Sequence, residues 1–248
     1  IDVVPVTGWE GFEPKEKGKK IFGRGTADMK GAIVALISAF DRLEREGKDS
    51  DFDISIIIST DEEIGQASQL RYLKGFLEPL EDAFIFNLDT DFGFATIASL
   101  GILQLKVKVR GKSVHSGLAH LGKNAVEDAV VLIHELMDLK KRVSSRKSNI
   151  GANPATELEK MKGRLNINVI EGGEKENVIP DECIFSVDRR LIPEEDMDEA
   201  EEELINTLNS VEKVDFEILD TLKVPSYSIE DPIVDELNTI IQEETSEG

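Results

Sequence analysis

The sequence has one cysteine, few basic residues and no long hydrophobic run, and each scarcity excludes a class of protein. Cys183 alone cannot form an internal disulfide, and no apolar leader stands at the start, so we expect a cytoplasmic protein. The chain has only 29 Lys and Arg residues compared with 50 Asp and Glu residues, and the net charge of -21 argues against a nucleic-acid partner. No apolar run approaches the roughly 18 residues that span a bilayer, so we expect no membrane partner.

The first part of the chain alternates helical and strand patterns. Apolar side chains at helical spacing predict a helix over residues 30–46 that ends at Gly47. The run from Ile54 to Ile58 and the segment 83–88 are apolar on both faces, which favours buried parallel strands. A further helix is predicted over residues 67–77. This order indicates an α/β domain.

From residue 102 the pattern changes. Residues 103–110 alternate strictly between apolar and polar, as in a half-exposed antiparallel strand. A helix is predicted at 124–141, strands at 164–170 and 183–188, a helix at 194–208 and a strand at 214–219. The order β-α-β-β-α-β is that of a ferredoxin-like α+β fold.

The boundaries of these patterns predict an insertion. We assign residues 1–98 to an α/β domain, 99–222 to an inserted ferredoxin-like domain, and 223–248 to a return to the first domain, with a helix over 231–243. Ile1 stands directly before a strand pattern, and the last helix is not followed by a strand. We therefore expect the α/β domain to continue in residues outside this sequence.

Acidic residues mark the candidate site. Glu62 and Glu63 follow the first predicted strand, Asp89 follows the second, and Asp28 lies in a glycine-rich loop before a helix. In open α/β sheets, sites form beyond the carboxyl ends of the strands, so these carboxylates are expected to converge. A carboxylate at the end of an apolar strand is costly unless it is paired or binds a metal. The pattern predicts a metal site.

Two nucleotide-binding interpretations compete with the metal site. The loop at residues 23–31 lacks the Gly-Lys-Ser/Thr ending of a phosphate loop, and Gly111-Lys112-Ser113 lacks the glycine five positions earlier. The segment Asp89-Thr90-Asp91 resembles pairs that hold a magnesium-bound phosphate. A magnesium-dependent transferase is therefore kept as an alternative.

These motifs together resemble a known family. Asp2-Val3-Val4-Pro5, the loop 23–31 and Asp61-Glu62-Glu63 are similar to the dinuclear-zinc peptidase and deacylase family of acetylornithine deacetylase, succinyl-diaminopimelate desuccinylase, aminoacylase and glutamate carboxypeptidase. The resemblance continues through residues 111–117, 122–125 and 172–181. It implies a zinc-peptidase-like α/β catalytic domain with an inserted dimerisation domain.

The resemblance also implies roles for the acidic residues. Asp28 would bridge two divalent metal ions, zinc by preference, with cobalt or manganese as alternatives. Glu63 and Asp89 would each bind one ion, Glu62 would be the general base, and Asp2 would orient a metal-bound histidine. The family's two metal-binding histidines would fall before Ile1 and after Gly248, and none of the three histidines present can replace them.

The second domain carries the remaining roles. By resemblance, His115 would reach the site of the partner subunit in a homodimer and polarise the scissile carbonyl. Asn177 and Arg190 would bind the substrate carboxylate, although Arg190 could equally be a surface charge. The expected function is hydrolysis of the amide bond of a small N-acyl amino acid or short peptide. A catalytically silent dimeric homologue that serves as a binding or scaffold protein is the other alternative.

Overall fold

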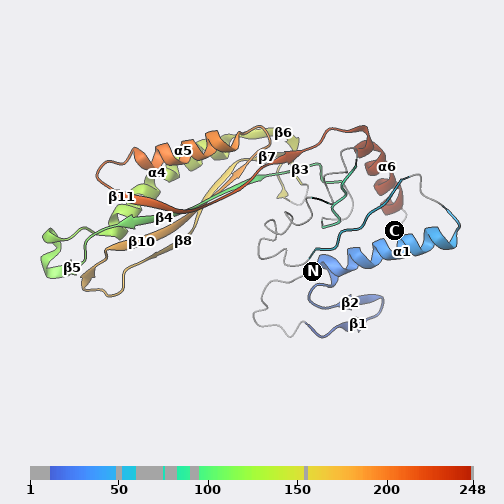
Figure 1. Ribbon diagram of the computed structural model, residues 1–248, viewed down its shortest axis with the longest axis horizontal. Helices are drawn as coiled ribbons and strands as arrows, with labels where there is room; N and C mark the ends of the chain where they lie inside the picture. The colour runs from blue at the N-terminus through green and yellow to red at the C-terminus, as the bar shows by residue number, and fades with distance from the viewer. Residues whose placement is uncertain are drawn as a thin grey trace. The chain divides into compact units, whose positions relative to one another are not determined.

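The computed structural model describes residues 12–48, 52–59, 75, 83–89, 95–153 and 156–246, and it divides into two compact units, Ile1–Phe92 and Gly93–Gly248 (Figure 1). Asp2, Glu62, Glu63 and, except for Gly75, the predicted helix at 67–77 lie outside the described residues. The domain boundaries expected after residues 98 and 222 stay a prediction.

The first unit contains a hairpin and one long helix. Strands β1 (Lys15–Lys17) and β2 (Lys20–Phe22) pair antiparallel, and the irregular helical turn η1 (Thr26–Gly31) leads into α1 (Ala32–Arg45). Helix α1 confirms the prediction for residues 30–46 to within two residues at the N-terminal end. Gly47 follows it with φ of 62°, a left-handed conformation that glycine adopts without strain and that commonly ends helices.

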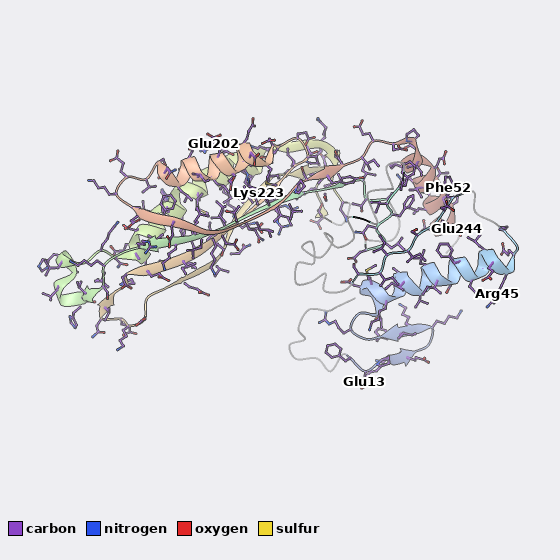
Figure 2. The ribbon with its side chains drawn as sticks, viewed as in Figure 1. Glu13, Arg45, Phe52, Glu202, Lys223 and Glu244 are labelled. Carbon is purple, nitrogen blue, oxygen red and sulfur yellow. The ribbon has the colours of Figure 1, made fainter. Side chains whose placement is uncertain are left out.

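The predicted buried strands at 54–58 and 83–88 are not formed in the part of the chain that is described. Residues 53–59 and 83–89 have no strand pairing, and Ile54 and Ile57 are 52% and 47% exposed. Phe52, labelled in Figure 2, is 78% exposed. A buried parallel strand needs a paired neighbour and cover on both faces, and the described residues supply neither.

The second unit has the predicted ferredoxin-like sheet. Its long strands are β4 (Gly101–Arg110), β8 (Arg164–Gly172), β10 (Glu182–Leu191) and β11 (Asp215–Val224). They form an antiparallel sheet in the order β11-β4-β10-β8, so the first and last strands are neighbours. Both β8 and β11 are edge strands.

Two helices, α4 (Ala125–Ser145) and α5 (Met197–Asn209), pack on the same face of this sheet (Figure 1). Side chains at helical spacing on α4 meet the alternate residues of the strands in one core. Leu105, Leu132 and Phe185 are fully buried in it. Each helix has an N-cap side chain: Asn124 and Asp196 both accept hydrogen bonds from two backbone N–H groups.

A separate two-stranded ladder lies at each end of this sheet. At one end, β5 (Val114–His115) pairs with β9 (Val178–Ile179), and the helical turn η4 (Ser116–Leu121) follows β5. At the other end, β3 (Ala98–Ser99) pairs with β12 (Tyr227–Ser228). The remaining elements are β6 (Lys147–Gly151), β7 (Lys160–Lys162) and α6 (Pro232–Ser246).

A buried arginine joins β10 to α5. The Arg189 side chain is 1% exposed, and it pairs with Glu195 at 2.9 Å and with Glu203 at 2.8 Å. Arg146 pairs with the same two carboxylates at 2.6 and 2.7 Å, which closes a ring of two arginines and two glutamates. Burial opposes ionisation of Glu203, but hydrogen bonds and charge from Arg146 and Arg189 outweigh it, so the pKa of Glu203 is lowered.

Within the described residues, no helix is both long enough and apolar enough to cross a membrane.

Candidate functional site

Asp28 and Asp89 are the two predicted metal ligands that the structure describes. Asp28 lies in η1 with φ of -111° and ψ of 100°, and its side chain is exposed. The loop depends on glycine, because a Cβ at Gly31 would lie 2.8 Å from the Thr26 carbonyl oxygen. Asp89 is also exposed, and its N–H donates to the Asn87 side chain at 2.9 Å.

The chemistry of these two groups fits a divalent cation. Neither carboxylate has an ion pair within the described residues, so the oxygens of both are available as ligands. Carboxylate oxygen suits zinc, manganese and magnesium. No cluster of three or more potential metal ligands occurs among the described residues, and Glu63, the third predicted carboxylate, lies outside them.

His115 is held in a defined orientation at the tip of the second unit. Its Nδ1 accepts a hydrogen bond from the Gly117 N–H at 3.2 Å. In a neutral imidazole the acceptor nitrogen carries no proton, so Nε2 carries it and is the donor. The side chain is exposed. His115 therefore presents an N–H donor to whatever approaches the tip.

Asn177 lies beside His115. Its carbonyl oxygen accepts a hydrogen bond from the Ser116 N–H at 2.9 Å, and His115 pairs with Val178 in the β5–β9 ladder. Both residues were predicted from the sequence as substrate-binding residues, but the backbone pairing that brings them together was not. The signal for this pairing is that Val114, Val178 and Ile179 are β-branched, which is typical of strands.

The loop that carries His115 is fixed by close backbone contacts. Gly111 donates to the Asp181 carbonyl at 2.7 Å, and Lys112 and Lys123 exchange backbone hydrogen bonds at 2.8 and 3.0 Å. A Cβ at Gly111 would overlap the Lys123 carbonyl oxygen and lie 2.9 Å from the Pro180 carbonyl oxygen. Glycine is required there because the backbones approach too closely for a side chain.

Arg190 is held by an aspartate that sequence reasoning did not assign to the site. The Asp188 carboxylate accepts from Arg190 Nε at 2.8 Å and Nη2 at 3.1 Å. Gln104 donates to the same carboxylate at 2.7 Å. Asp188 is 6% exposed, and a charge that is so buried needs such partners. The two-residue spacing of Asp188 and Arg190 on one strand was the signal for this pairing, since residues i and i+2 lie on the same face of a sheet.

Within one subunit, the structure does not bring Arg190 to His115 and Asn177. The latter lie beyond the end of β10 at Glu182, whereas Arg190 is near its other end. Eight residues of strand span about 26 Å. Figure 1 shows β5 and β3 at opposite ends of this unit. Residues so far apart cannot contact one small substrate from a single copy of the unit.

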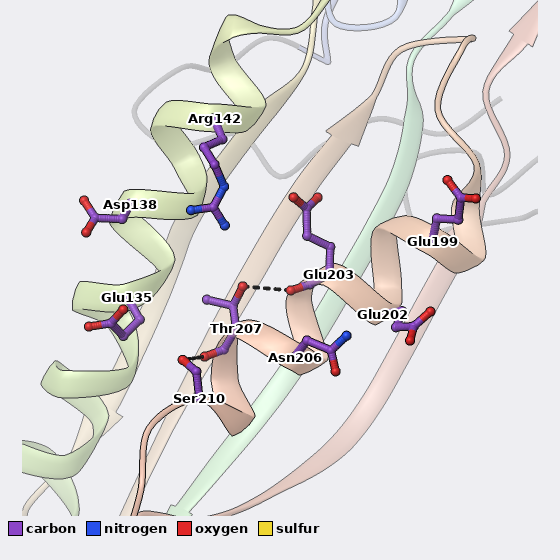
Figure 3. Close-up of a pocket in the computed structure, with 9 residues that line it drawn as sticks. All are labelled: Glu135, Asp138, Arg142, Glu199, Glu202, Glu203, Asn206, Thr207 and Ser210. Atoms are coloured by element: carbon purple, nitrogen blue, oxygen red, sulfur yellow. Dashed lines mark hydrogen bonds between the residues drawn. The ribbon is translucent and has the colours of Figure 1, made fainter.

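A groove of about 600 Å³ lies between α4 and α5 (Figure 3). It is lined mainly by acidic side chains, among them Glu135, Asp138, Glu199 and Glu202. Thr207 and Ser210 use their hydroxyls to donate to carbonyls of their own helix. The groove contains none of the predicted site residues.

Comparison with known proteins gives three kinds of match. Residues 97–215 match the peptidase dimerisation domain. The chain is 30% identical over 216 residues to a probable succinyl-diaminopimelate desuccinylase of Staphylococcus aureus, and the match covers 81% of the chain and 53% of that protein. A similar protein of Staphylococcus epidermidis is 28% identical over 200 residues, 75% of the chain and 49% of the relative. The chain spans about half the length of these curated relatives.

Solved structures share the fold. Human carnosine dipeptidase 1 matches with a TM-score of 0.61 and 20% identity over 94% of the chain and 62% of that protein. A tripeptidase from Staphylococcus aureus matches with a TM-score of 0.65 and 18% identity over 94% and 60%. These matches confirm the architecture of a peptidase-type α/β domain with a dimerisation domain, and the chain belongs to the M20 peptidase family.

Proposed function

We propose that the protein is a metal-dependent hydrolase that cleaves the amide bond of a small N-acyl amino acid or short peptide in the cytoplasm. The observation that carries this proposal is the 30% identity over 216 residues to a protein named as a probable desuccinylase. Desuccinylation and dipeptide cleavage both hydrolyse a linear amide beside a carboxylate.

The acidic residues of the first unit are proposed to hold two divalent ions, preferably zinc. Asp28 would bridge them, Glu63 and Asp89 would each bind one, and Asp2 would orient a metal-bound histidine. Such ions, when bound, lower the pKa of water toward neutrality. Glu62 would accept the proton of the attacking water and deliver it to the leaving amine.

The second unit is proposed to bind and polarise the substrate. The Nε2–H of His115, oriented by the Gly117 N–H, suits a donor to the carbonyl oxygen that becomes negative during attack. Asn177 and Arg190 would bind the carboxylate. Because His115 and Arg190 lie at opposite ends of the sheet, we assign them to different subunits of a homodimer.

The outer edge of β8 is the proposed dimer contact. Among the described residues its one neighbour in the sheet is β10, and Val169 and Ile170 of this strand are 45% and 51% exposed. Val130 of α4 is 55% exposed, and Val126 of the same helix lies against Gly172 at the end of β8. An unpaired edge beside exposed apolar side chains is suited to pairing with a second copy.

Glu62→Gln and Asp28→Ala test the catalytic assignment in the complete gene product. With added zinc, cobalt or manganese, the wild type should hydrolyse at least one member of a panel of acetylated, succinylated and dipeptide substrates. Glu62→Gln should keep its metal content and lose hydrolysis, whereas Asp28→Ala should lose metal. Full turnover by Glu62→Gln would show that the base is wrongly assigned. A folded, metal-loaded wild type that cleaves none of the panel would favour the silent homologue.

Mixed dimers test the sharing of the site. His115→Ala and Arg190→Ala should each be inactive alone. After the two variants are mixed and allowed to exchange subunits, each heterodimer has one site with both native residues, so about a quarter of the wild-type activity should return. If the mixture stays inactive although exchange is complete, the two residues act within one subunit or not at all.

A further inference from the structure

Arg190 has a second arginine directly opposite it on the sheet. In the register of β10 and β8, Arg190 pairs with Arg164, and the next pair on the same face is Asp188 with Asn166. Residues directly opposite each other point to the same face, with Cα atoms about 4.5–5.5 Å apart. That face is the one opposite α4 and α5, since Arg189, the intervening residue of β10, contacts α5.

The charge of Arg190 is already balanced. Its Nε and one N–H of Nη2 are taken by Asp188, so Nη1 and the second N–H of Nη2 stay without a partner among the described residues. Gln104 fixes Asp188 from the strand on the other side. The guanidinium is thus held rigidly, with one edge free for a further acceptor.

Arg164 is not balanced. It is exposed, and within the described residues it makes no ion pair, although the protein has 50 acidic residues and only 29 basic ones. Like charges opposite each other on a sheet are destabilising. The one carboxylate of Asp188 does not balance two guanidinium groups, and the Lys140 ammonium, which donates to the Asn166 side chain at 2.9 Å, adds a further positive charge beside them. A bound carboxylate would reduce this excess of positive charge.

We propose that Arg164 and Arg190 together form a receptor for one carboxylate of the substrate, with Asp188 and Gln104 as positioning residues for Arg190. Arg164 then makes the enzyme select N-acyl amino acids or peptides with a free carboxylate over their neutral amides. This inference rests on the proposed function, because it assigns Arg190 to substrate binding.

Binding in the Glu62→Gln background tests the receptor without turnover. Calorimetric titration of the complete gene product would use the best N-acyl amino acid of the panel and its C-terminal amide. Arg164→Gln should weaken binding of the acid roughly tenfold or more and leave binding of the amide unchanged, since a hydrogen bond to a charged group contributes about that much. Arg164→Lys, which keeps the charge, should recover part of the loss.

Arg142→Gln is the matched control, because Arg142 is an exposed arginine on α4, on the other face of the sheet. It should bind the acid as the parent does. Equal affinity of Arg164→Gln and the parent for the acid would overturn the receptor while leaving the hydrolase intact. If the panel is not hydrolysed but the acid still binds in an Arg164-dependent way, the receptor stands and the proposed function fails.

Discussion

Replacing Arg189 with methionine should be among the most destabilising single changes in the second unit. The side chain is 1% exposed, and its partners Glu195 and Glu203 are 10% and 27% exposed. Methionine keeps most of the apolar stem but removes both ion pairs and the hydrogen bond to the Ala200 carbonyl. Breaking a buried ion pair from one side costs about 3–5 kcal/mol, because the remaining charge is left without its partner.

The lower end of that range applies because Arg146 continues to pair with both glutamates. We therefore expect a loss of about 3 kcal/mol in the free energy of unfolding, or about 6–12 °C in Tm for a unit of this size. Urea unfolding followed by circular dichroism measures it. Arg146→Met removes a guanidinium from the same two carboxylates at a more exposed position, and should cost about 1 kcal/mol.

The pH dependence gives an independent check. The folded-state pKa of Glu203 is below its ordinary value of 4.5, so its stabilising contribution is present above that value and is lost as pH falls through the folded-state pKa. The difference between wild type and Arg189→Met should therefore shrink as the pH is lowered from 4.5. The reasoning would be refuted if Arg189→Met lost less stability than Arg146→Met at neutral pH.

Three further changes probe local structure. Gly111→Ala should lower the free energy of unfolding by about 1–3 kcal/mol, because its Cβ would meet backbone atoms, and should reduce kcat by displacing the His115 loop. Unchanged Tm and kcat would contradict the close packing. Asn124→Ala should cost about 1 kcal/mol in urea unfolding by removing the N-cap of α4, and a cost near zero would show that the cap is dispensable. Val130→Asp places a charge at the proposed dimer contact and should shift the protein to monomer in analytical ultracentrifugation. Val131→Asp, on the same helix and also exposed, is the control. Dissociation by both variants or by neither would argue against a dimer contact at the β8 edge.

The second unit was predictable because its strands have one covered face. Alternation of polar and apolar residues over 103–110 and 164–169 indicates that asymmetry, and strands form at both places. Helix α4 was predicted from its apolar face and begins within one residue of the expected start. The same alternation on β10 places Arg189 on the covered face with Phe185 and Val187, a signal that the sequence reasoning overlooked.

The apolar runs at 54–58 and 83–88 were less informative about structure. An apolar run indicates that its side chains would be stabilised by burial, but it does not show that other segments cover them. Their side chains are exposed in the described structure.

The register between strands is a second property that composition does not predict. The pairing of Arg190 with Arg164 joins residues 26 positions apart, and only the ladder between β8 and β10 shows it.

The adjacency of β4 and β11 bears on how the predicted insertion could enter or leave a protein in evolution. Val224 lies opposite Ile102, so the chain departs about 5 Å from where it arrives. A two-residue turn would suffice to close the gap if residues 101–225 were deleted. Under the predicted insertion, β3 and β12, which already pair with each other, would need no rearrangement to accept the sheet. A shuffled gene could gain or lose the unit in a single event.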